Sequence, residues 1–198
     1  MSNEQHVDYC VFARDLNQEV AFRSVEFEKD VKRLHQWHHE AHVIPFWQQN
    51  FSFSDYQAHL KKLLADRHHT LYIGYLDGVP MSYWEAYWVQ DDIVGKYYEP
   101  DAFDQGVHLL IGPSESIGKG YALPLLREMI AFQFQSSQTK RVVAEPDIRN
   151  EKMIHVFEKC GFKRIKEIEL PDKQALLMFC ERERFFERWS DSEAFEHC

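Results

Sequence analysis

The segment that decides the fold is "GVHLLIGPSESIGKGYALPLLREMIAFQFQ", residues 106–135. Its apolar run 107–111 predicts a strand, and the long apolar-periodic segment after Gly120 predicts a helix. Between them, Gly118-Lys119-Gly120 forms a turn. Such a turn exposes backbone N–H groups at a helix N-terminus, which favours binding of an anion. A Gly-x-Gly pair is a weak signal by itself, so a tight turn without any ligand is the structural alternative.

The rest of the chain alternates predicted strands with predicted helices. Around residues 77–78, "HTLYIGYLDGVPMSYWEAYWV" has the pattern of a hairpin of two aromatic-rich strands. Further strands are predicted at 9–14, 20–25, 140–146, 163–170 and 174–181. Helices are predicted at 27–40, at 55–66 after a Ser54 cap, from residue 119, and at 150–161. This order predicts an α/β fold, a central mixed sheet with helices on both faces. We expect one domain over residues 1–189 and a polar tail over 190–198.

Composition narrows the classes of function. The chain has 198 residues, 44% of them hydrophobic, which is ample for one packed domain. The formal net charge of −9 argues against a general nucleic-acid binder. No apolar run reaches membrane-spanning length, and the first residues have no secretory pattern. The four cysteines form no CxxC pair, so we expect free thiols in the cytoplasm. The sequence leaves open whether the protein is a monomer or a homodimer.

The glycine turn after a central strand resembles the acyl-CoA site of GNAT-type acyltransferases, which usually reads Gln/Arg-x-x-Gly-x-Gly. This chain has Glu115 at the first position and Lys119 between the glycines. Within that superfamily, several motifs resemble the acyltransferases of siderophore biosynthesis that make the hydroxamates of aerobactin and alcaligin or acylate lysine in mycobactin assembly. The motifs, between Leu34 and Met178, are "LHQWHHEAHVIPFW", "GVHLLIG", "AEPDIRNEKMIHVFEKCGFKRI" and "ELPDKQALLM". The first of these departs from the family at "HHEAHVIP", where members often read Asn-Asp-Pro.

The resemblance implies a GNAT fold and a reaction. An acetyl or succinyl group would pass from coenzyme A, the co-substrate, to an N-hydroxylated diamine or N6-hydroxylysine, giving a hydroxamate. The partner would be a small-molecule acceptor, and no metal is implied. Rival hypotheses are an aminoglycoside or other small-amine N-acetyltransferase, a peptide acetyltransferase, and a module that binds acyl-CoA or metal without turnover.

The resemblance also implies site residues. His108 maps onto the proposed catalytic base, although a lone strand histidine is more often a core residue. Strand alternation places His108 on one face with Leu110 and Gly112. Asp147 maps onto the family's aspartate and would orient His108 or hold the acceptor; a helix N-cap is its structural alternative. For coenzyme A, we expect contacts from the strand backbone, the glycine turn and the following motif: Leu109, Ile111, Gly118, Lys119, Gly120 and Asn150.

Residues that bind the acceptor are predicted from the aromatic and histidine-rich segments. Glu85 interrupts "YWEAYW" and either lies on an exposed strand face or binds a cationic amine. Trp47, Trp84 and His38 are the other candidates. One helix carries a histidine cluster, in which two members have the i,i+4 spacing of metal ligands, but we favour a solvated face at the acceptor mouth. The cluster consists of His35, His38, His39 and His42.

Overall fold

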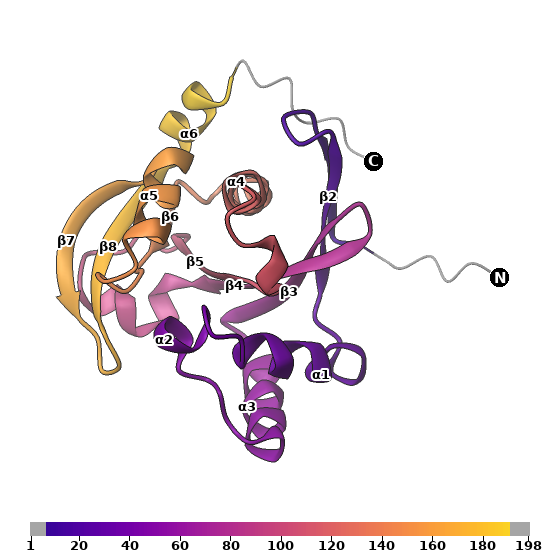
Figure 1. Cartoon of the computed structure of the whole chain (residues 1–198). Coiled ribbons are helices and arrows are strands. Elements are labelled where there is room, and N and C mark those ends of the chain that lie inside the picture. Colours follow the sequence, from indigo (N-terminus) through magenta and orange to yellow (C-terminus); the bar gives the residue numbers. More distant parts are fainter. Residues whose placement is uncertain (1–6, 191–198) are drawn as a thin grey trace.

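The computed structural model of the chain describes residues 7–190 (Figure 1). The domain boundaries expected from the sequence remain a prediction. The predicted tail lies outside the described residues except for Ser190. Eight strands form one sheet in the order β1-β2-β3-β4-β5-β6-β8-β7. All neighbouring strands are antiparallel except β5 and β6, which are parallel. The predicted mixed central sheet is confirmed.

The predicted strands are present, with boundaries shifted by one to a few residues. The strands are β1 (Tyr9–Ala13), β2 (Gln18–Ser24), β3 (His69–Leu76), β4 (Val79–Trp88), β5 (Gln105–Ile111), β6 (Arg141–Ala144), β7 (Lys163–Glu169) and β8 (Gln174–Glu181). The hairpin turn between β3 and β4 is at Asp77-Gly78, and both residues have positive φ. That conformation matches the twist of the strands, and Asp-Gly adopts it at low cost.

The helices also follow the prediction, with two omissions. They are α1 (Phe27–His38), α2 (Ile44–Trp47), α3 (Phe53–Ala65), α4 (Ala122–Gln133), α5 (Glu151–Cys160) and α6 (Arg182–Arg188), with 3-10 turns η1 (Val89–Asp91), η2 (Ile93–Lys96) and η3 (Ser114–Ser116). The short α2 and α6 were not predicted. The cap of α3 is Ser52, whose Oγ accepts from Asp55 N at 3.2 Å, so the prediction of Ser54 was two residues late.

Helices cover both faces of the sheet, as Figure 1 shows. On one face α4 and α5 pack over Phe22 and Trp84, and on the other α1 and α3 pack over Ala21 and Tyr83. Neighbouring residues such as Ala21 and Phe22, or Tyr83 and Trp84, lie on opposite faces because successive side chains of a strand point to opposite sides. No helix in residues 7–190 has the length and apolar character needed to span a membrane.

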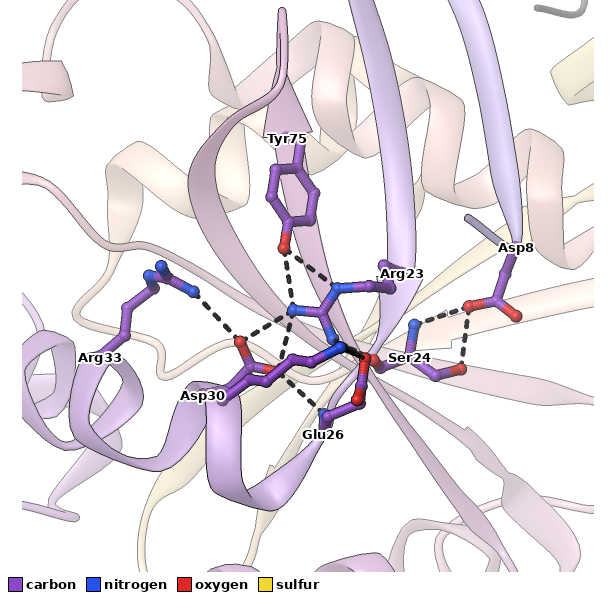
Figure 2. Close-up of polar contacts among 8 residues, drawn as sticks. Asp8, Arg23, Ser24, Glu26, Asp30, Arg33 and Tyr75 are labelled. Atoms are coloured by element: carbon purple, nitrogen blue, oxygen red, sulfur yellow. Dashed lines mark hydrogen bonds and ion pairs between the residues drawn. The ribbon is translucent and has the colours of Figure 1, made fainter. Parts of the chain in front are cut away.

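A buried ion pair fastens α1 to the sheet (Figure 2). Arg23 on β2 donates two hydrogen bonds from Nη2 to the Asp30 carboxylate, at 2.8 and 3.0 Å. Tyr75 on β3 accepts from Arg23 through its hydroxyl, and Arg33 adds a second cation to Asp30. Asp30 also accepts from the backbone N–H of Glu26, the residue before α1. This network satisfies both buried charges and sets the start of the helix that leads toward the site.

The cysteines differ in state. Cys160 and Cys180 are free and buried, as predicted. Cys10 is disulfide-bonded, so the expectation of a free thiol is wrong for this residue. Cys198 lies outside the described residues.

Candidate active site

The site forms where β5 and β6 separate. These strands pair only at Gln105–Val142 and Gly106–Val143, and β5 then continues to Ile111 without β6 beside it. Residues 107–111 therefore have one edge that is free of a partner strand, so their backbone polar groups on that side can bind a ligand. His108 and Glu145 each come two residues after the last pair. Side chains two apart share a face, so the two face each other across the opening.

A small cavity of about 170 Å³ occupies this opening. Four carboxylate side chains, one lysine and His108 give it a polar wall, and aromatic and aliphatic residues complete it. The lining includes Trp47, Glu85, His108, Glu145, Asp147, Asn150, Asp172 and Lys173. The predicted candidates His108, Asp147, Glu85 and Trp47 are thus brought together.

His108 is held between two buried glutamates. Its Nδ1 lies 2.9 Å from Glu85 Oε2, and its Nε2 contacts Glu145 Oε1. Tyr83 donates to the second oxygen of Glu85 at 2.9 Å, and Tyr87 donates to that of Glu145 at 2.7 Å. A neutral imidazole has one N–H, so only the protonated ring can donate to both carboxylates. The three side chains form a unit with one proton on each ring nitrogen, which we call the Glu85–His108–Glu145 unit.

Charge within this unit shifts all three pKa values. Burial opposes a charged His108, but the charge and hydrogen bond of Glu145, followed by those of Glu85, raise its pKa to about 10. Burial likewise opposes a charged Glu145, yet His108 lowers the pKa of that carboxyl to about 2. The pKa of Glu85 is also lowered, because hydrogen bonds from His108 and Tyr83 outweigh its burial. His108 therefore carries a proton near neutral pH, unlike the neutral base implied by the family resemblance.

Asp147 lines the same cavity, but its hydrogen bonds are directed elsewhere. Arg149 donates to Asp147 Oδ1 from Nε at 2.9 Å and to Oδ2 from Nη2 at 2.6 Å. Asn150 caps α5, since its Oδ1 accepts from Met153 N at 3.2 Å. The N-cap reading of Asp147 is therefore wrong. The orienting contacts of His108 come from Glu85 and Glu145, whereas the sequence had suggested Asp147.

A second, larger cavity of about 680 Å³ continues from the first between β5, the glycine turn and α5. Five of the six residues expected to contact coenzyme A line it: Leu109, Ile111, Gly118, Gly120 and Asn150. The sixth, Lys119, is exposed and does not line this cavity, so the structure does not place it with the other five.

The glycine turn has the geometry that its sequence suggested. Gly118 and Gly120 have φ values of +78° and +83°, a region that favours glycine. Tyr121, the residue before α4, makes no side-chain cap, and the first turn of α4 has no acidic residue. The N–H groups at this helix end are thus not taken by a capping side chain and can meet an anion.

Basic side chains at the larger cavity come from α5 and were not predicted from the sequence. Lys152, His155 and Lys159 line it. Their spacing of three and four residues places them on one helix face, a signal that the sequence does carry. A cavity with an anion-binding turn, cationic side chains and an apolar stem fits an acyl-CoA, whose diphosphate and pantetheine arm have those properties.

Trp47 and Glu85, which the sequence suggested for acceptor binding, both line the small cavity. Trp47 lines both cavities, and its ring meets that of His108 edge-on at 6.2 Å. Glu85 is 5% exposed, so the reading of an exposed strand face is wrong.

Trp84 and His38 do not reach the cavity. Trp84 lies on the α4 face of β4, because its neighbours 83 and 85 take the other face. It is fully buried there, and its Nε1 donates to Ser82 Oγ at 2.7 Å. His38 is fully buried behind Trp47, with Nδ1 2.8 Å from the carbonyl of Leu34. Both are therefore corrections to the predicted acceptor site.

The four histidines of the predicted cluster do not converge on one point, since His35 and His38 lie on α1 and His39 and His42 follow it. The buried position of His38 contradicts the expected solvated face at that residue, and His42 turns toward the carbonyl of Ile111 at 2.8 Å. Within residues 7–190, the only converging set of three candidate metal ligands is elsewhere, at Asp66, His68 and His69. The four histidines of the predicted cluster thus do not form such a set.

Comparison with known proteins agrees with this geometry. Residues 26–170 match the family model of the acetyltransferase (GNAT) domain. N-hydroxyputrescine acetyltransferase of Acinetobacter baumannii is 32% identical over 172 residues, which cover 85% of this chain and 80% of that protein. N(6)-hydroxylysine O-acetyltransferase of Escherichia coli is 31% identical over 84% of this chain, which spans only 53% of that relative, about half its length.

Two solved structures support the fold. An uncharacterized protein from Bacillus halodurans is 52% identical with a TM-score of 0.90, covering 92% of this chain and 94% of that one. The aminoglycoside acetyltransferase AAC(6')-Ib, solved with coenzyme A and kanamycin, is 26% identical with a TM-score of 0.78, covering 87% and 99%. With a family match over residues 26–170, a relative 32% identical over most of both chains, and the glycine turn beside a split sheet, the chain belongs to the GNAT acetyltransferase family.

Proposed function

We propose that this protein is an acyl-CoA-dependent N-acyltransferase that acylates an N-hydroxylated amine to a hydroxamate. The observation that carries the proposal is the Glu85–His108–Glu145 unit, which lines a small acidic cavity that shares Trp47 and Leu109 with a larger cavity suited to acyl-CoA. Relatives named for acetyl transfer to hydroxyputrescine and hydroxylysine support the acceptor class. Because acyl-CoA thioesters are intracellular metabolites, we propose the cytoplasm as the place of reaction.

The donor is held by backbone more than by side chains in this proposal. The N–H groups at Gly118–Gly120 and the start of α4 bind the diphosphate, and the α5 cations Lys152 and Lys159 add charge. The thioester supplies an activated acyl carbon when bound. The free edge of β5 near Leu109 donates backbone N–H groups to the carbonyl oxygen, which stabilises the oxyanion as it forms.

A hydroxylamine acceptor suits the groups of the site that can accept and hold protons. Its nitrogen is a much weaker base than an alkylamine, whose pKa is about 10.4 in lysine, so it is uncharged near pH 7. As the carbon–nitrogen bond forms and the carbon–sulfur bond breaks, the nitrogen loses a proton and the leaving thiolate gains one. The Glu85–His108–Glu145 unit bears two negative charges and one positive charge, so one carboxylate can accept the proton and the unit becomes neutral. A weak base suffices, because attack makes the nitrogen acidic.

A second candidate, acetylation of an aminoglycoside, is favoured by the likeness to AAC(6')-Ib and by the acidic wall of the small cavity. One assay separates the candidates. Purified protein is incubated with acetyl-CoA or succinyl-CoA and with N-hydroxyputrescine, N6-hydroxylysine or kanamycin. Released thiol is measured, together with the coloured iron(III) complex that hydroxamates form.

The proposal expects thiol release and an iron(III)-binding product with a hydroxylated acceptor. Turnover of kanamycin alone would establish the second candidate. Thiol release without an iron(III)-binding product would indicate O-acylation, and binding of acetyl-CoA without any turnover would refute the enzyme.

A further inference from the structure

The charges around the small cavity discriminate between acceptors with and without a carboxylate. We propose that the acceptor is an N-hydroxylated diamine whose free ammonium binds Asp172, and that an N-hydroxylated amino acid is disfavoured. This inference rests on the proposed function, since it names the acceptor class of the same site.

The cavity wall has an excess of negative charge that its own residues do not fully pair. Glu85 and Glu145 share the proton-bearing ring of His108. Asp147 is paired with Arg149 through both of its oxygens. Asp172 is the fourth carboxylate of the wall, and no side-chain hydrogen bond or ion pair involves it within residues 7–190. One anion at the mouth of the cavity is therefore available to a ligand.

Asp172 is also in a suitable place. It lies in the turn between β7 and β8 and is exposed to solvent while lining the cavity. Its backbone carbonyl accepts a long hydrogen bond of 3.5 Å from Gln48 Nε2, just after α2. The β7–β8 turn therefore contacts the residue that follows α2, and Asp172 lies at the exposed end of the cavity, whereas Glu85 and Glu145 are buried at its inner end.

Among residues 7–190, the cavity wall offers no comparable cation that is free for a carboxylate. Lys173 is the one lysine of the wall, and its Nζ lies 4.0 Å from Glu145 Oε1. An α-carboxylate would have to compete with Glu145 for Lys173 and would add a fifth negative charge at this wall. Because like charges at close range repel, binding of such an acceptor is disfavoured.

A diamine with one hydroxylated nitrogen matches this arrangement at both ends. Near pH 7 its hydroxylamine is neutral, and its primary amine, with a pKa of about 10.4 as in lysine, is charged. The charged end is drawn to Asp172 at the mouth, which directs the neutral end toward His108 and Glu145. A molecule with both features gains affinity from the ammonium contact, and its KM is therefore lower.

Matched acceptors test the inference. N-hydroxyputrescine and N5-hydroxyornithine differ by one carboxylate, as do N-hydroxycadaverine and N6-hydroxylysine, so each pair keeps its chain length. We expect kcat/KM to be higher for each diamine by at least about tenfold, the scale of one misplaced charge. Equal rates within both pairs would overturn the inference and leave the proposed function standing. Failure of all four to give a hydroxamate would refute the proposed function itself, and the inference with it.

A variant assigns the effect to Asp172. Asp172→Asn should raise the KM for N-hydroxyputrescine by about five- to tenfold, with kcat and the KM for acetyl-CoA near wild type. N-hydroxybutylamine, which lacks the ammonium, should show little change. Glu28→Gln is the control, because Glu28 is an exposed acid in the first turn of α1. An unchanged KM for N-hydroxyputrescine in Asp172→Asn, or an equal rise for N-hydroxybutylamine, would overturn the role of Asp172.

Discussion

His108 and Glu145 meet across the point where two parallel strands part. Each follows the last paired residue of its strand by two positions, Gly106 for His108 and Val143 for Glu145. The opening in the sheet is thus lined by an ion pair at its inner end, beside a cavity that leads to the glycine turn. The same backbone feature makes room for the ligand and positions the groups that handle its proton.

Removing a carboxylate from this unit should affect catalysis more than donor binding. For Glu145→Gln we expect a fall in kcat of about 10²-fold or more, as for loss of a group that accepts a proton. The KM for acetyl-CoA should change little, because Glu145 lines only the small cavity. Steady-state kinetics at several pH values checks both. Glu181→Gln is the control, since Glu181 is an ion-paired glutamate on β8 that does not line either cavity. A Glu145→Gln enzyme with wild-type kcat would rule out its part in the chemical step.

The raised pKa of His108 predicts how stability varies with pH. Because the pKa of His108 is raised in the folded state, the charged ring contributes its full stabilisation of the fold below the unfolded-state pKa of 6.5. This contribution is lost as the pH rises through the folded-state pKa of about 10. The stability advantage of wild type over His108→Gln should therefore be greatest near pH 6 and shrink toward pH 10, by at most about 1.4 kcal/mol per pH unit. Urea unfolding of both proteins from pH 6 to 10 measures it. An advantage that stays constant with pH would mean that His108 is not charged in the folded state.

Gly120 offers a test of the donor site with a matched control. A Cβ at Gly120 meets no atom within 4 Å, but the φ of +83° strains any other residue. Gly78 in the β3–β4 hairpin has the same two properties, with φ +73°, and lies outside the cavities. Gly120→Ala and Gly78→Ala should both lose about 1–2 kcal/mol of stability, but only Gly120→Ala should weaken acetyl-CoA binding, by about tenfold. Calorimetric titration and thermal melting decide. Equal affinities in the two variants would remove the turn from the donor site.

The buried pair of Arg23 and Asp30 should matter for stability and little for chemistry. Asp30→Ala leaves the guanidinium of Arg23 without its carboxylate partner in the interior, and losing one member of a buried pair typically costs about 3–5 kcal/mol. Chemical unfolding should show that loss, while kcat per folded molecule stays near wild type. A loss under about 1 kcal/mol would mean that Arg23 finds other partners, among which Tyr75 is already bonded.

Much of the fold was predictable, because its signals are local. The Asp77-Gly78 hairpin and the glycine turn each depend on a few adjacent residues. The faces of β5 were also predictable, since Leu109 and Leu110 pack into different cores as strand alternation requires.

The partners of His108 were not predictable in the same way. Glu85 faces His108 only through the register of β4 with β5, and Glu145 only through the two-residue pairing of β5 with β6. A single sequence does not fix either register. Trp84 was misplaced because an aromatic run shows which residues are apolar but not which face each one takes. His38 was misplaced because a histidine next to polar neighbours can still be buried when its ring nitrogen bonds to the helix backbone.

The central claim, transfer of an acyl group to a hydroxylated nitrogen with help from the Glu85–His108–Glu145 unit, is tested most directly by comparing N-hydroxyputrescine with putrescine over pH 6–9. Hydroxylation leaves the reacting nitrogen uncharged near pH 7, whereas an alkylamine must first lose a proton. The account predicts that kcat/KM at pH 7 is much larger for N-hydroxyputrescine than for putrescine, and that this ratio shrinks as the pH rises toward the amine pKa. In Glu145→Gln, kcat/KM should fall for both acceptors. Putrescine acylated as fast as N-hydroxyputrescine at pH 7 would contradict the account and indicate a general amine acetyltransferase.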